Sequence, residues 1–473
     1  MTRTAPDWDA LQGDISGNVV LPSSPEYDSA RKSAIARFHG VRPRAVVLCE
    51  SPEDVSGTIS FARRHGLRTA TRSGGHCFAG RSSTEGIVID VSPMRSVSVS
   101  GGMATVGAGA RLGDVYDALA EHGLTIPAGS GPPVGISGLA LGGGLGILGR
   151  KHGLTSDHLL GAQIVLADGS IIQCDEHHDG DLFWALRGAG GGNFGVVTSL
   201  TFDTIPAPAA TVFHLLWPHT HAAAVIHAWQ ERAPTAPDEL AASLLLSASG
   251  DVDEPPAVNV FGSMLGAESD AADPLDEVVI RAGADPTSVF RKRMSYLETK
   301  RYLAELGDAM AGDRPQGHPF SKSEFFRRPL PTEAIEALVE NFTTGRSAGQ
   351  SRELDFTPWG GAYNRVPADA TAFVHRDERF LRKHVVEIDS EAPSAEREEA
   401  RVWLARSWGS VHRWGSGGVY QNFPDPDLAD WERAYYGTNL GRLVRAKRKY
   451  EPDNFFRFHQ SLPNHVPGSG ALP

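Results

Sequence analysis

Hydrophobic and polar positions in the first part of the chain alternate in short, regular blocks. The apolar run AVVLCE at 45–50 and the segment LRTATRSGG at 67–75 predict two strands. Between them, residues 51–66 have the apolar spacing of an amphipathic helix. Ser51 is a good N-cap, a proline follows in the first turn, and Gly66 is a typical helix end. This stretch therefore predicts a strand, a helix and a second strand.

The same alternation continues to about residue 206 and then changes. Further elements predicted before that point are strands at 86–94, 103–110, 161–174 and 195–206 and a helix at 112–123. After it, longer strands alternate with amphipathic helices, which is typical of an antiparallel sheet with helices on one face. These later elements are strands at 211–217, 241–248 and 256–265 and C-terminal helices at 427–437 and 439–450.

Length and composition fit an α+β protein of two or three domains. The chain has 473 residues, of which 41% are hydrophobic, so it can bury a large core. We expect an N-terminal segment packed on the first domain, a first domain with glycine-rich loops, a second domain built on the antiparallel sheet, and a C-terminal segment that returns to the first domain. Their boundaries are 1–41, 42–206, 207–416 and 417–473.

The charge balance argues against a nucleic-acid or membrane partner. The net charge is -12, whereas binding to phosphate groups needs clustered cations. The basic run RLVRAKRKY at 442–450 has helical spacing, and we expect it to be a solvated helix face. No segment approaches the roughly 18 apolar residues of a membrane span, and the first residues lack the apolar core of a signal peptide. We therefore expect a cytoplasmic protein.

Neither the cysteines nor the acidic run at 174–181 has the residue spacing of a metal site. Cys49, Cys77 and Cys174 cannot form a disulfide framework and lack the spacing of a zinc site. The run CDEHHDGD at 174–181 holds histidines and carboxylates, but it is rich in turn residues and has no pair of histidines one helical turn apart. We expect a solvated turn there and no bound metal.

Three segments of small residues stand out in the first domain, at 72–80, 129–146 and 188–195. Glycine lets a backbone approach a ligand where a side chain would block it, and successive backbone amides can bind an anion such as a pyrophosphate. Tight turns explain single glycines, but they do not explain three consecutive glycines in two places. We therefore expect an extended ligand that lies across all three segments.

A nicotinamide site is the alternative interpretation. Gly144, Gly146 and Gly149 satisfy the pattern GxGxxG, but that fingerprint must open a full helix after a strand. Gly153 breaks any helix a few residues later. The residues GAGGGNFG at 188–195 match the same pattern, which shows how easily it arises by chance. We do not expect a nicotinamide cofactor.

Longer motifs connect these segments to a known family. RSGGH with AGRSS, VGISGLALGGGLG, DLFWALRGAGGGNFGVV and the C-terminal YQNF, YYGTNLGRL and YEPDNFF resemble the berberine bridge enzyme-like flavoproteins, which have an FAD-binding fold of the vanillyl-alcohol-oxidase type. The resemblance extends from Arg42 to Leu462. It implies a two-lobed FAD-binding domain followed by an antiparallel-sheet substrate domain covered by helices, with FAD as the cofactor.

The resemblance also implies covalent attachment of FAD through His76, because the family histidine in this motif is bonded to the flavin's 8α-methyl carbon. A second bond through a cysteine in the motif GxCPxVG is not expected, because this chain has Gly131 there. A single bond implies a lower flavin potential and a less open substrate cleft. The expected FAD contacts are Arg72, Ser73, Gly74, Gly75, His76, Gly80, Ser82, Gly131, Val134, Gly135, Gly138, Gly142, Gly143, Gly144, Gly146, Asn193, Gly195, Val197, Tyr420 and Asn422.

The sequence defines the catalytic residues less clearly than the FAD contacts. In many relatives the motif YxNY provides a tyrosine base at its last position, but this chain has Phe423, which cannot accept a proton. Tyr420 is one candidate acceptor. His384 and Glu387, on a strand predicted within 371–389, are others. They face opposite sides of that strand, and a period of two does not show which side meets the flavin.

Together these features predict an FAD-dependent oxidoreductase. We expect an oxidase that acts on an alcohol or related group of a small molecule, a sugar or a secondary metabolite, with dioxygen as the electron acceptor. A dehydrogenase that uses another acceptor, or a flavin-bearing protein with little turnover, is the alternative, since Phe423 replaces the family tyrosine. The sequence gives no indication of the oligomeric state.

Overall fold

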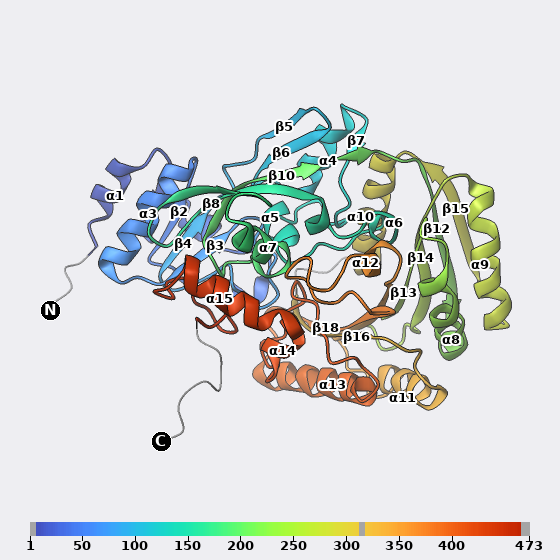
Figure 1. The fold of residues 1–473 in the computed structure, drawn as a ribbon. Coiled ribbons are helices and arrows are strands. Elements are labelled where there is room, and N and C mark those ends of the chain that lie inside the picture. The colour runs from blue at the N-terminus through green and yellow to red at the C-terminus, as the bar shows by residue number, and fades with distance from the viewer. Residues whose placement is uncertain (1–5, 312–316, 465–473) are drawn as a thin grey trace, which may run out of the picture.

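In a computed structural model of the chain, residues 6–311 and 317–464 are described. Figure 1 shows two lobes beside each other. The N-terminal lobe comprises residues 6–206 and also the C-terminal segment 417–464, whose residues Tyr435 and Leu443 share one hydrophobic core with it. The sheet lobe comprises residues 207–416 and has its own core between a large sheet and its helices. Both lobes mix helices and strands, as expected of an α+β protein.

Two sheets form the centre of the N-terminal lobe. The first has the strand order β1 (Asn18–Val20), β2 (Ala45–Leu48), β4 (Ile87–Asp90) and β3 (Thr69–Arg72). Its last three strands are parallel, and β1 joins β2 antiparallel. The second sheet is antiparallel, with the order β5 (Val97–Ser100), β6 (Met103–Gly107), β10 (Val196–Asp203), β8 (Leu159–Val165) and β9 (Ile171–Cys174). A short pair, β7 (Leu124–Thr125) with β11 (Ile205–Pro206), lies beside them.

Local sequence signals determine where the helix between β2 and β3 begins and ends. Helix α3 (Pro52–His65) begins after Ser51, whose side chain accepts a hydrogen bond from the backbone N of Asp54 at 3.1 Å. It ends at Gly66, which has a left-handed φ of 60°. The predicted helix and both of its ends are therefore confirmed. The other longer helices within residues 6–206 are α1 (Trp8–Asp14), α4 (Leu112–Ala120) and α7 (Gly180–Ala189).

The glycine-rich segment at 129–146 contains a helix that the sequence analysis did not predict. Helix α5 (Ile136–Leu141) buries Ile136 and Ala140, which lie one helical turn apart. The next helix, α6 (Gly149–His152), is a single turn that stops at Gly153, where φ is 96°. The expected break at Gly153 is therefore confirmed, and GxGxxG does not open a long helix here.

The sheet lobe is built on a seven-stranded antiparallel sheet. In spatial order its strands are β15 (Ser288–Met294), β12 (Ala210–Pro218), β14 (Ala257–Leu265), β13 (Leu240–Ala248), β17 (Ser351–Pro358), β18 (Phe380–Ile388) and β16 (His318–Phe326). The helices α8 (Ala222–Arg232), α9 (Glu268–Ala282), α11 (Thr332–Thr343) and α13 (Ser394–His412) pack on one face. This arrangement confirms the expected sheet with helices on one side.

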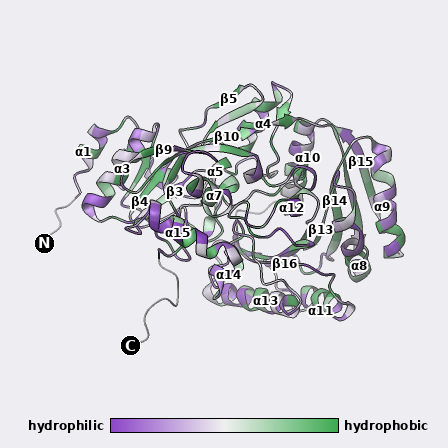
Figure 2. Cartoon of the chain, viewed as in Figure 1, coloured by the Kyte–Doolittle hydropathy of each residue, from purple (hydrophilic) through white to green (hydrophobic). Residues whose placement is uncertain are grey.

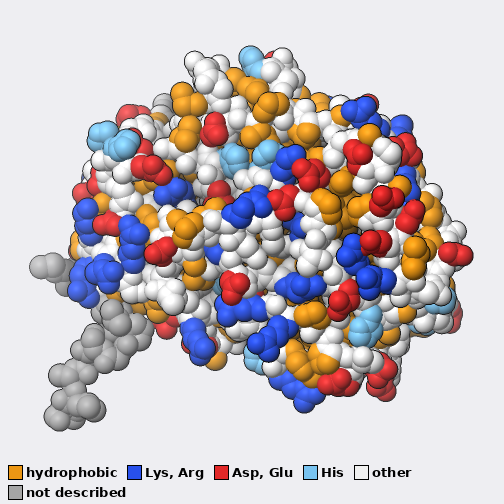
Figure 3. Space-filling view, turned by 45° about the vertical axis from the view of Figure 1, so that its right-hand side comes forward, with side chains coloured by type: hydrophobic (Ala, Val, Ile, Leu, Met, Phe, Trp, Pro, Cys, Tyr) orange, Lys and Arg blue, Asp and Glu red, His pale blue; other side chains and the backbone are white. Residues whose placement is uncertain are grey.

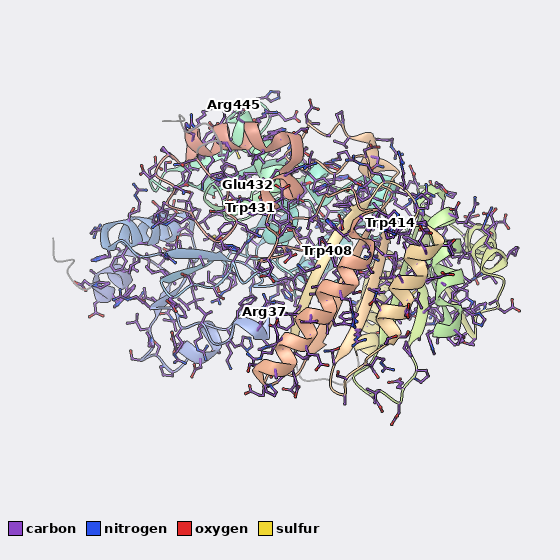
Figure 4. All side chains as sticks on the ribbon, turned by 90° about the horizontal axis from the view of Figure 1, so that it is seen from below. Arg37, Trp408, Trp414, Trp431, Glu432 and Arg445 are labelled. Carbon is purple, nitrogen blue, oxygen red and sulfur yellow. The ribbon has the colours of Figure 1, made fainter. Side chains whose placement is uncertain are left out.

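The basic run at 442–450 is only partly a solvated face. It lies in α15 (Leu440–Tyr450), which follows α14 (Trp431–Tyr436), and Arg445 is exposed there, as Figure 4 shows. Lys447 departs from the expectation, because it is fully buried and pairs with Glu451 at 2.5 Å. Its stem lies in the apolar stripe of the helix, and an ion pair offsets the cost of burying its charge.

Polar and apolar side chains are distributed as in a water-exposed fold. Figure 2 shows hydrophobic residues concentrated along the strands and mixed faces on outer helices such as α9 and α13. Figure 3 shows positive and negative side chains interspersed over one face of the molecule. Within residues 6–311 and 317–464, no helix is long and apolar enough to span a membrane.

Candidate active site

Three glycine-rich segments of the N-terminal lobe lie against one another. A Cβ added at Gly74 would lie 2.3 Å from the backbone N of Gly135, so the first two segments touch through their backbones. In the third segment, the backbone N of Gly190 donates a hydrogen bond to the carbonyl of Leu141 at 3.1 Å. The segments therefore meet, which a single ligand touching all three would require.

His76 lies where the first segment faces the second. Its half-buried ring hydrogen-bonds to the backbone of Pro133. Burial, together with the positive charge of Arg111, lowers the pKa of the imidazole below its ordinary value. At neutral pH the ring is therefore uncharged, and one nitrogen keeps its lone pair.

Two serine hydroxyls in the loop that follows His76 lack protein partners. The side-chain oxygens of Ser82 and Ser83 are buried, and neither has a hydrogen-bond partner among the described residues. Gly138, in the short helix α5, has no atom within 4 Å of the position of an added Cβ, so it borders open space. A dinucleotide offers phosphate and ribose oxygens to such groups. These residues therefore fit FAD.

Tyr420 lies over the second glycine-rich segment and is 2% exposed. Its hydroxyl oxygen accepts hydrogen bonds from the backbone N of Gly144 at 2.9 Å and from Asn422 Nδ2 at 3.0 Å. Asn422 Nδ2 also donates to the carbonyl of Leu139 at 2.9 Å. Burial raises the pKa of the Tyr420 phenol to about 12, although these hydrogen bonds act in the opposite direction. The phenol is therefore neutral near pH 7.

Phe423 connects the two lobes at this point. Its ring lies edge-on to Tyr420, with ring centroids 5.0 Å apart, and 6.1 Å from the ring of Phe78, two residues after His76. From the sheet lobe, Lys383 places its ammonium nitrogen 4.8 Å from the centre of the Phe423 ring. The position at which the resemblance places a catalytic tyrosine is thus bordered by a lysine.

The two faces of β18 have different surroundings, and His384 is on the face away from Tyr420. His384 is 1% exposed beneath α13, where its Nδ1 hydrogen-bonds to Ser407 Oγ at 2.8 Å and its Nε2 contacts the Arg382 guanidinium. Figure 4 shows α13 running across the sheet on this side. The expectation that His384 is a catalytic residue is therefore not supported by its position, because the sheet lies between its side chain and Tyr420, whereas Leu381 of the opposite face packs with Tyr420.

Glu387 is on the opposite face, together with Lys383. Its carboxylate accepts a hydrogen bond from the backbone N of Gly317 at 3.0 Å. It lies four residues farther along β18 than Lys383, so it reaches the same face at a greater distance from Phe423. A catalytic role for Glu387 stays a prediction.

Two predicted cofactor residues are engaged in structural contacts instead. The Arg72 guanidinium forms a buried ion pair with Asp90 at 2.7 Å and donates to carbonyls of the N-terminal segment. The side chain of Asn193 donates to Ala189 O at 2.9 Å and accepts a hydrogen bond from the backbone N of Leu462 at 2.9 Å. Their side chains hold neighbouring segments together, so these side chains are not free to bind a cofactor.

The remaining predicted cofactor residues are packed against other parts of the protein or lie in the first two glycine-rich segments. The hydroxyl of Ser73 donates to Ala108 O at 2.7 Å, and Gly195 and Val197 lie in the closely packed region at the start of β10. An added Cβ at Gly80 would collide with the ring of Phe38, at 2.5 Å. The others lie in the first two glycine-rich segments: Gly75, Gly131, Val134, Gly142, Gly143 and Gly146.

Sequence reasoning missed two buried polar residues at the second segment. Lys300, on α10 (Tyr296–Ala311), donates from Nζ to the carbonyls of Ala128 at 2.7 Å and Gly129 at 3.1 Å. Tyr363, on α12 (Ala362–Arg365), hydrogen-bonds through its hydroxyl to the carbonyl of Gly146 at 3.1 Å. No local pattern marks these residues, because their partners are far away in the sequence.

The acidic run at 174–181 forms a turn. The carboxylate of Asp175 accepts hydrogen bonds from the backbone N of His177 at 2.7 Å and of His178 at 2.8 Å. Both histidines are exposed. In the described part of the chain, no group of three or more histidine, cysteine or carboxylate side chains is placed to hold a metal.

Comparison with known proteins agrees with this geometry. A family model for an FAD binding domain matches residues 43–175, and a model named berberine and berberine like matches residues 419–463. The chain is also 33% identical over 461 residues to the uncharacterized FAD-linked oxidoreductase YgaK of Bacillus subtilis, and the match covers 95% of this chain and 97% of that protein. The chain belongs to the berberine bridge enzyme-like family. It is therefore an FAD-linked oxidoreductase.

Members of this family with stated activities are also similar. Chitooligosaccharide oxidase of Gibberella zeae is 32% identical over 89% of this chain and 87% of its own length. A solved structure of a chitooligosaccharide oxidase has a TM-score of 0.84 at 26% identity, and covers 97% of this chain and 99% of its own.

Two solved variants of berberine bridge enzyme also match, with TM-scores of 0.86 and 0.85 at 25% and 26% identity, covering 96% and 97% of this chain and 98% and 100% of their own. One replaces a glycine by alanine and is described as a reticuline dehydrogenase. The other replaces the cysteine two positions later.

Proposed function

We propose that this protein is an oxidase that carries FAD on a single covalent bond to His76, oxidises an alcohol or related group of a small-molecule substrate, and passes the electrons to dioxygen. The observation that carries the proposal is the position of His76, a half-buried and uncharged imidazole at the contact of two glycine-rich segments. When bound, FAD accepts the hydride of the substrate and returns its electrons to the acceptor.

The imidazole of His76 is suited to covalent attachment because its pKa is lowered. A neutral ring nitrogen is a nucleophile, whereas a protonated one is not. The Pro133 backbone, which is hydrogen-bonded to the ring, fixes the orientation of the imidazole. Gly131 provides no thiol, so only one bond to the protein is expected.

The covalent bond is tested by denaturing the holoprotein. We expect FAD to stay with the wild-type polypeptide in acid or detergent and to be released from the His76→Ala variant. A peptide mass that places FAD on His76 would complete the assignment. Protein-bound flavin in denatured His76→Ala would contradict it.

The choice between oxidase and dehydrogenase depends on Gly129. It lies two residues before Gly131, which occupies the position of the family cysteine, so it matches the glycine whose replacement by alanine is described in berberine bridge enzyme as giving a dehydrogenase. An added Cβ at Gly129 would meet Leu139 Cδ1 at 3.0 Å, and no left-handed φ prevents the substitution. The presence of glycine rather than alanine at this position supports the proposal that the protein is an oxidase.

We expect Gly129→Ala to slow reoxidation of the reduced flavin in air by about tenfold or more, which corresponds to a barrier increase of about 1.4 kcal/mol. Reduction of an artificial acceptor should stay fast in this variant. Gly57→Ala in α3 is the control, because an added Cβ there meets only Ile15, at 3.4 Å. Reoxidation of wild-type enzyme over minutes rather than seconds would favour the dehydrogenase.

A further inference from the structure

The sheet lobe holds the second glycine-rich segment at both of its ends. At the first end, Lys300 Nζ donates hydrogen bonds to the carbonyls of Ala128 at 2.7 Å and Gly129 at 3.1 Å. At the second end, the Tyr363 hydroxyl donates to the carbonyl of Gly146 at 3.1 Å. A Cβ added at Gly146 would lie 2.1 Å from the carbonyl oxygen of Ala128, so the two ends touch each other. The position of this segment therefore depends on side chains of the other lobe.

Lys300 binds both of the peptide groups that flank the Cα of Gly129. The carbonyl of Ala128 belongs to the peptide group before this Cα, and the carbonyl of Gly129 belongs to the peptide group after it. Because peptide groups are planar, only φ and ψ at Gly129 stay adjustable, and glycine has the widest range of both angles. One ammonium that holds both carbonyls therefore fixes the orientation of this Cα.

Tyr116 holds the same point from the N-terminal lobe. Its hydroxyl, on α4, donates to the carbonyl of Gly129 at 2.5 Å. A carbonyl oxygen has two lone pairs, so Tyr116 and Lys300 together saturate it. Both donors are buried, which keeps water from competing for these hydrogen bonds.

A lysine is a costly residue for packing alone at this place. Its ammonium is buried between the rings of Tyr116 and Tyr296, whose centres lie 4.8 and 5.2 Å from Nζ. An apolar side chain would fill the same space without the loss of hydration that a buried charge suffers. What the lysine adds is a pair of hydrogen-bond donors for two consecutive carbonyls.

We propose that Lys300 is a positioning residue for the reaction of the reduced flavin with dioxygen, because it fixes the backbone on both sides of Gly129. Dioxygen is converted in that reaction to hydrogen peroxide by two electrons and two protons from the reduced flavin. Lys300 acts through Gly129 and not on the reacting atoms. This inference rests on the proposed function, which gives Gly129 its importance for dioxygen.

The test needs no substrate. The FAD-loaded enzyme is reduced by light without dioxygen and then mixed with air-saturated buffer or with ferricyanide, and the return of the flavin absorbance gives a rate for each acceptor. We expect Lys300→Met to lower the dioxygen rate about tenfold or more, since a displacement of about 1 Å can cost about 10²-fold. The ferricyanide rate should not change, because ferricyanide takes electrons from outside the site.

A second measurement does not depend on the reaction. Backbone amide hydrogen exchange over residues 126–134 is followed by mass spectrometry in the oxidised holoenzyme. We expect faster exchange in Lys300→Met than in the wild type, because the peptide groups beside Gly129 lose their donors. Unchanged exchange would show that Lys300 does not hold this backbone.

Three further variants separate positioning from general support of the fold. Tyr116→Phe removes only the hydroxyl that also binds Gly129, so it should lower the dioxygen rate in the same direction even if Lys300→Met does not fold. Arg301→Met is the matched control, because this exposed neighbour on α10 also reaches the N-terminal lobe, at Asp117, 2.9 Å away. It should match the wild type in both measurements. In a Gly129→Ala background, Lys300→Met should add little, because both changes act at one point.

Failure of the proposed function gives a different result. If the wild type reacts with dioxygen only over minutes but rapidly with ferricyanide, the oxidase is wrong, and the role of Lys300 is wrong with it. If the wild type reacts within seconds and Lys300→Met and Tyr116→Phe do so equally fast, the oxidase stands and the role of Lys300 is wrong. An equal loss of rate with both acceptors, or in Arg301→Met, would also overturn it. Intact FAD content in each variant excludes loss of the cofactor as the cause.

Discussion

At the scale of single residues, the site differs from its family in the residue that would accept a proton. Phe423 has no ionisable group, and the neighbouring Tyr420 keeps its own proton near pH 7, because burial raises its pKa to about 12. Its hydroxyl instead accepts hydrogen bonds from Gly144 and Asn422. This geometry favours a role for Tyr420 in holding the second glycine-rich segment in place.

The Tyr420→Phe variant separates the two roles. Removal of a general base slows flavin reduction by about 10² or more, whereas removal of a hydrogen-bond acceptor should slow it by less than about tenfold. We expect the smaller effect, measured by rapid mixing of substrate with oxidised enzyme, together with normal FAD content. A loss of about 10² that disappears at high pH would instead identify Tyr420 as the acceptor.

At the scale of elements, the sequence predicted structure best where the signals are local. Helix α3 depends on Ser51 and Gly66, which act on their own turns, so both helix ends were predictable. The polarity of β18 was also readable as a period of two. The sequence did not show which face of β18 meets the site, because that depends on α13, which comes later in the chain and packs over His384.

Long-range contacts explain the other differences. Lys447 has the same sequence context as its exposed neighbours in α15, but Glu451 and the Phe456 carbonyl surround its ammonium. Arg72 opens the motif RSGGH, yet its side chain pairs with Asp90 on the adjacent parallel strand. The motifs therefore located the three glycine-rich segments, whereas side-chain roles required the fold.

At the scale of the whole molecule, a buried lysine joins the two lobes. Lys300 of the sheet lobe binds the carbonyls of Ala128 and Gly129 in the N-terminal lobe, between the rings of Tyr116 and Tyr296 at 4.8 and 5.2 Å. Among the described residues, no carboxylate offsets the burial of its ammonium. Burial therefore lowers the pKa of the Lys300 ammonium to about 7.

This lysine should make stability depend on pH. Above about pH 7 the folded protein releases a proton from Lys300 that the unfolded chain keeps to about pH 10.5. The free energy of unfolding should therefore rise with pH in this window, by at most about 1.4 kcal/mol per pH unit from this group. Below pH 7 the contribution is constant, because both states hold the proton.

Denaturant unfolding of the wild type and Lys300→Met between pH 6 and 10 measures this contribution. We expect a smaller rise with pH in Lys300→Met than in the wild type, whereas the exposed Lys32→Met should match the wild type. Tyr116 and Tyr296 also face Lys300, but burial raises their pKa values above the window. Parallel curves for wild type and Lys300→Met would show that Lys300 does not titrate there.

The return of the C-terminal segment to the first lobe determines when that lobe can be completed during synthesis. Tyr435 and Leu443 belong to its core, and the backbone N of Leu462 binds Asn193 at 2.9 Å beside the third glycine-rich segment. A ribosome makes the N-terminal part first, but the lobe lacks these groups until nearly the whole chain has emerged. The glycine-rich segments therefore leave the ribosome well before the residues that complete their packing.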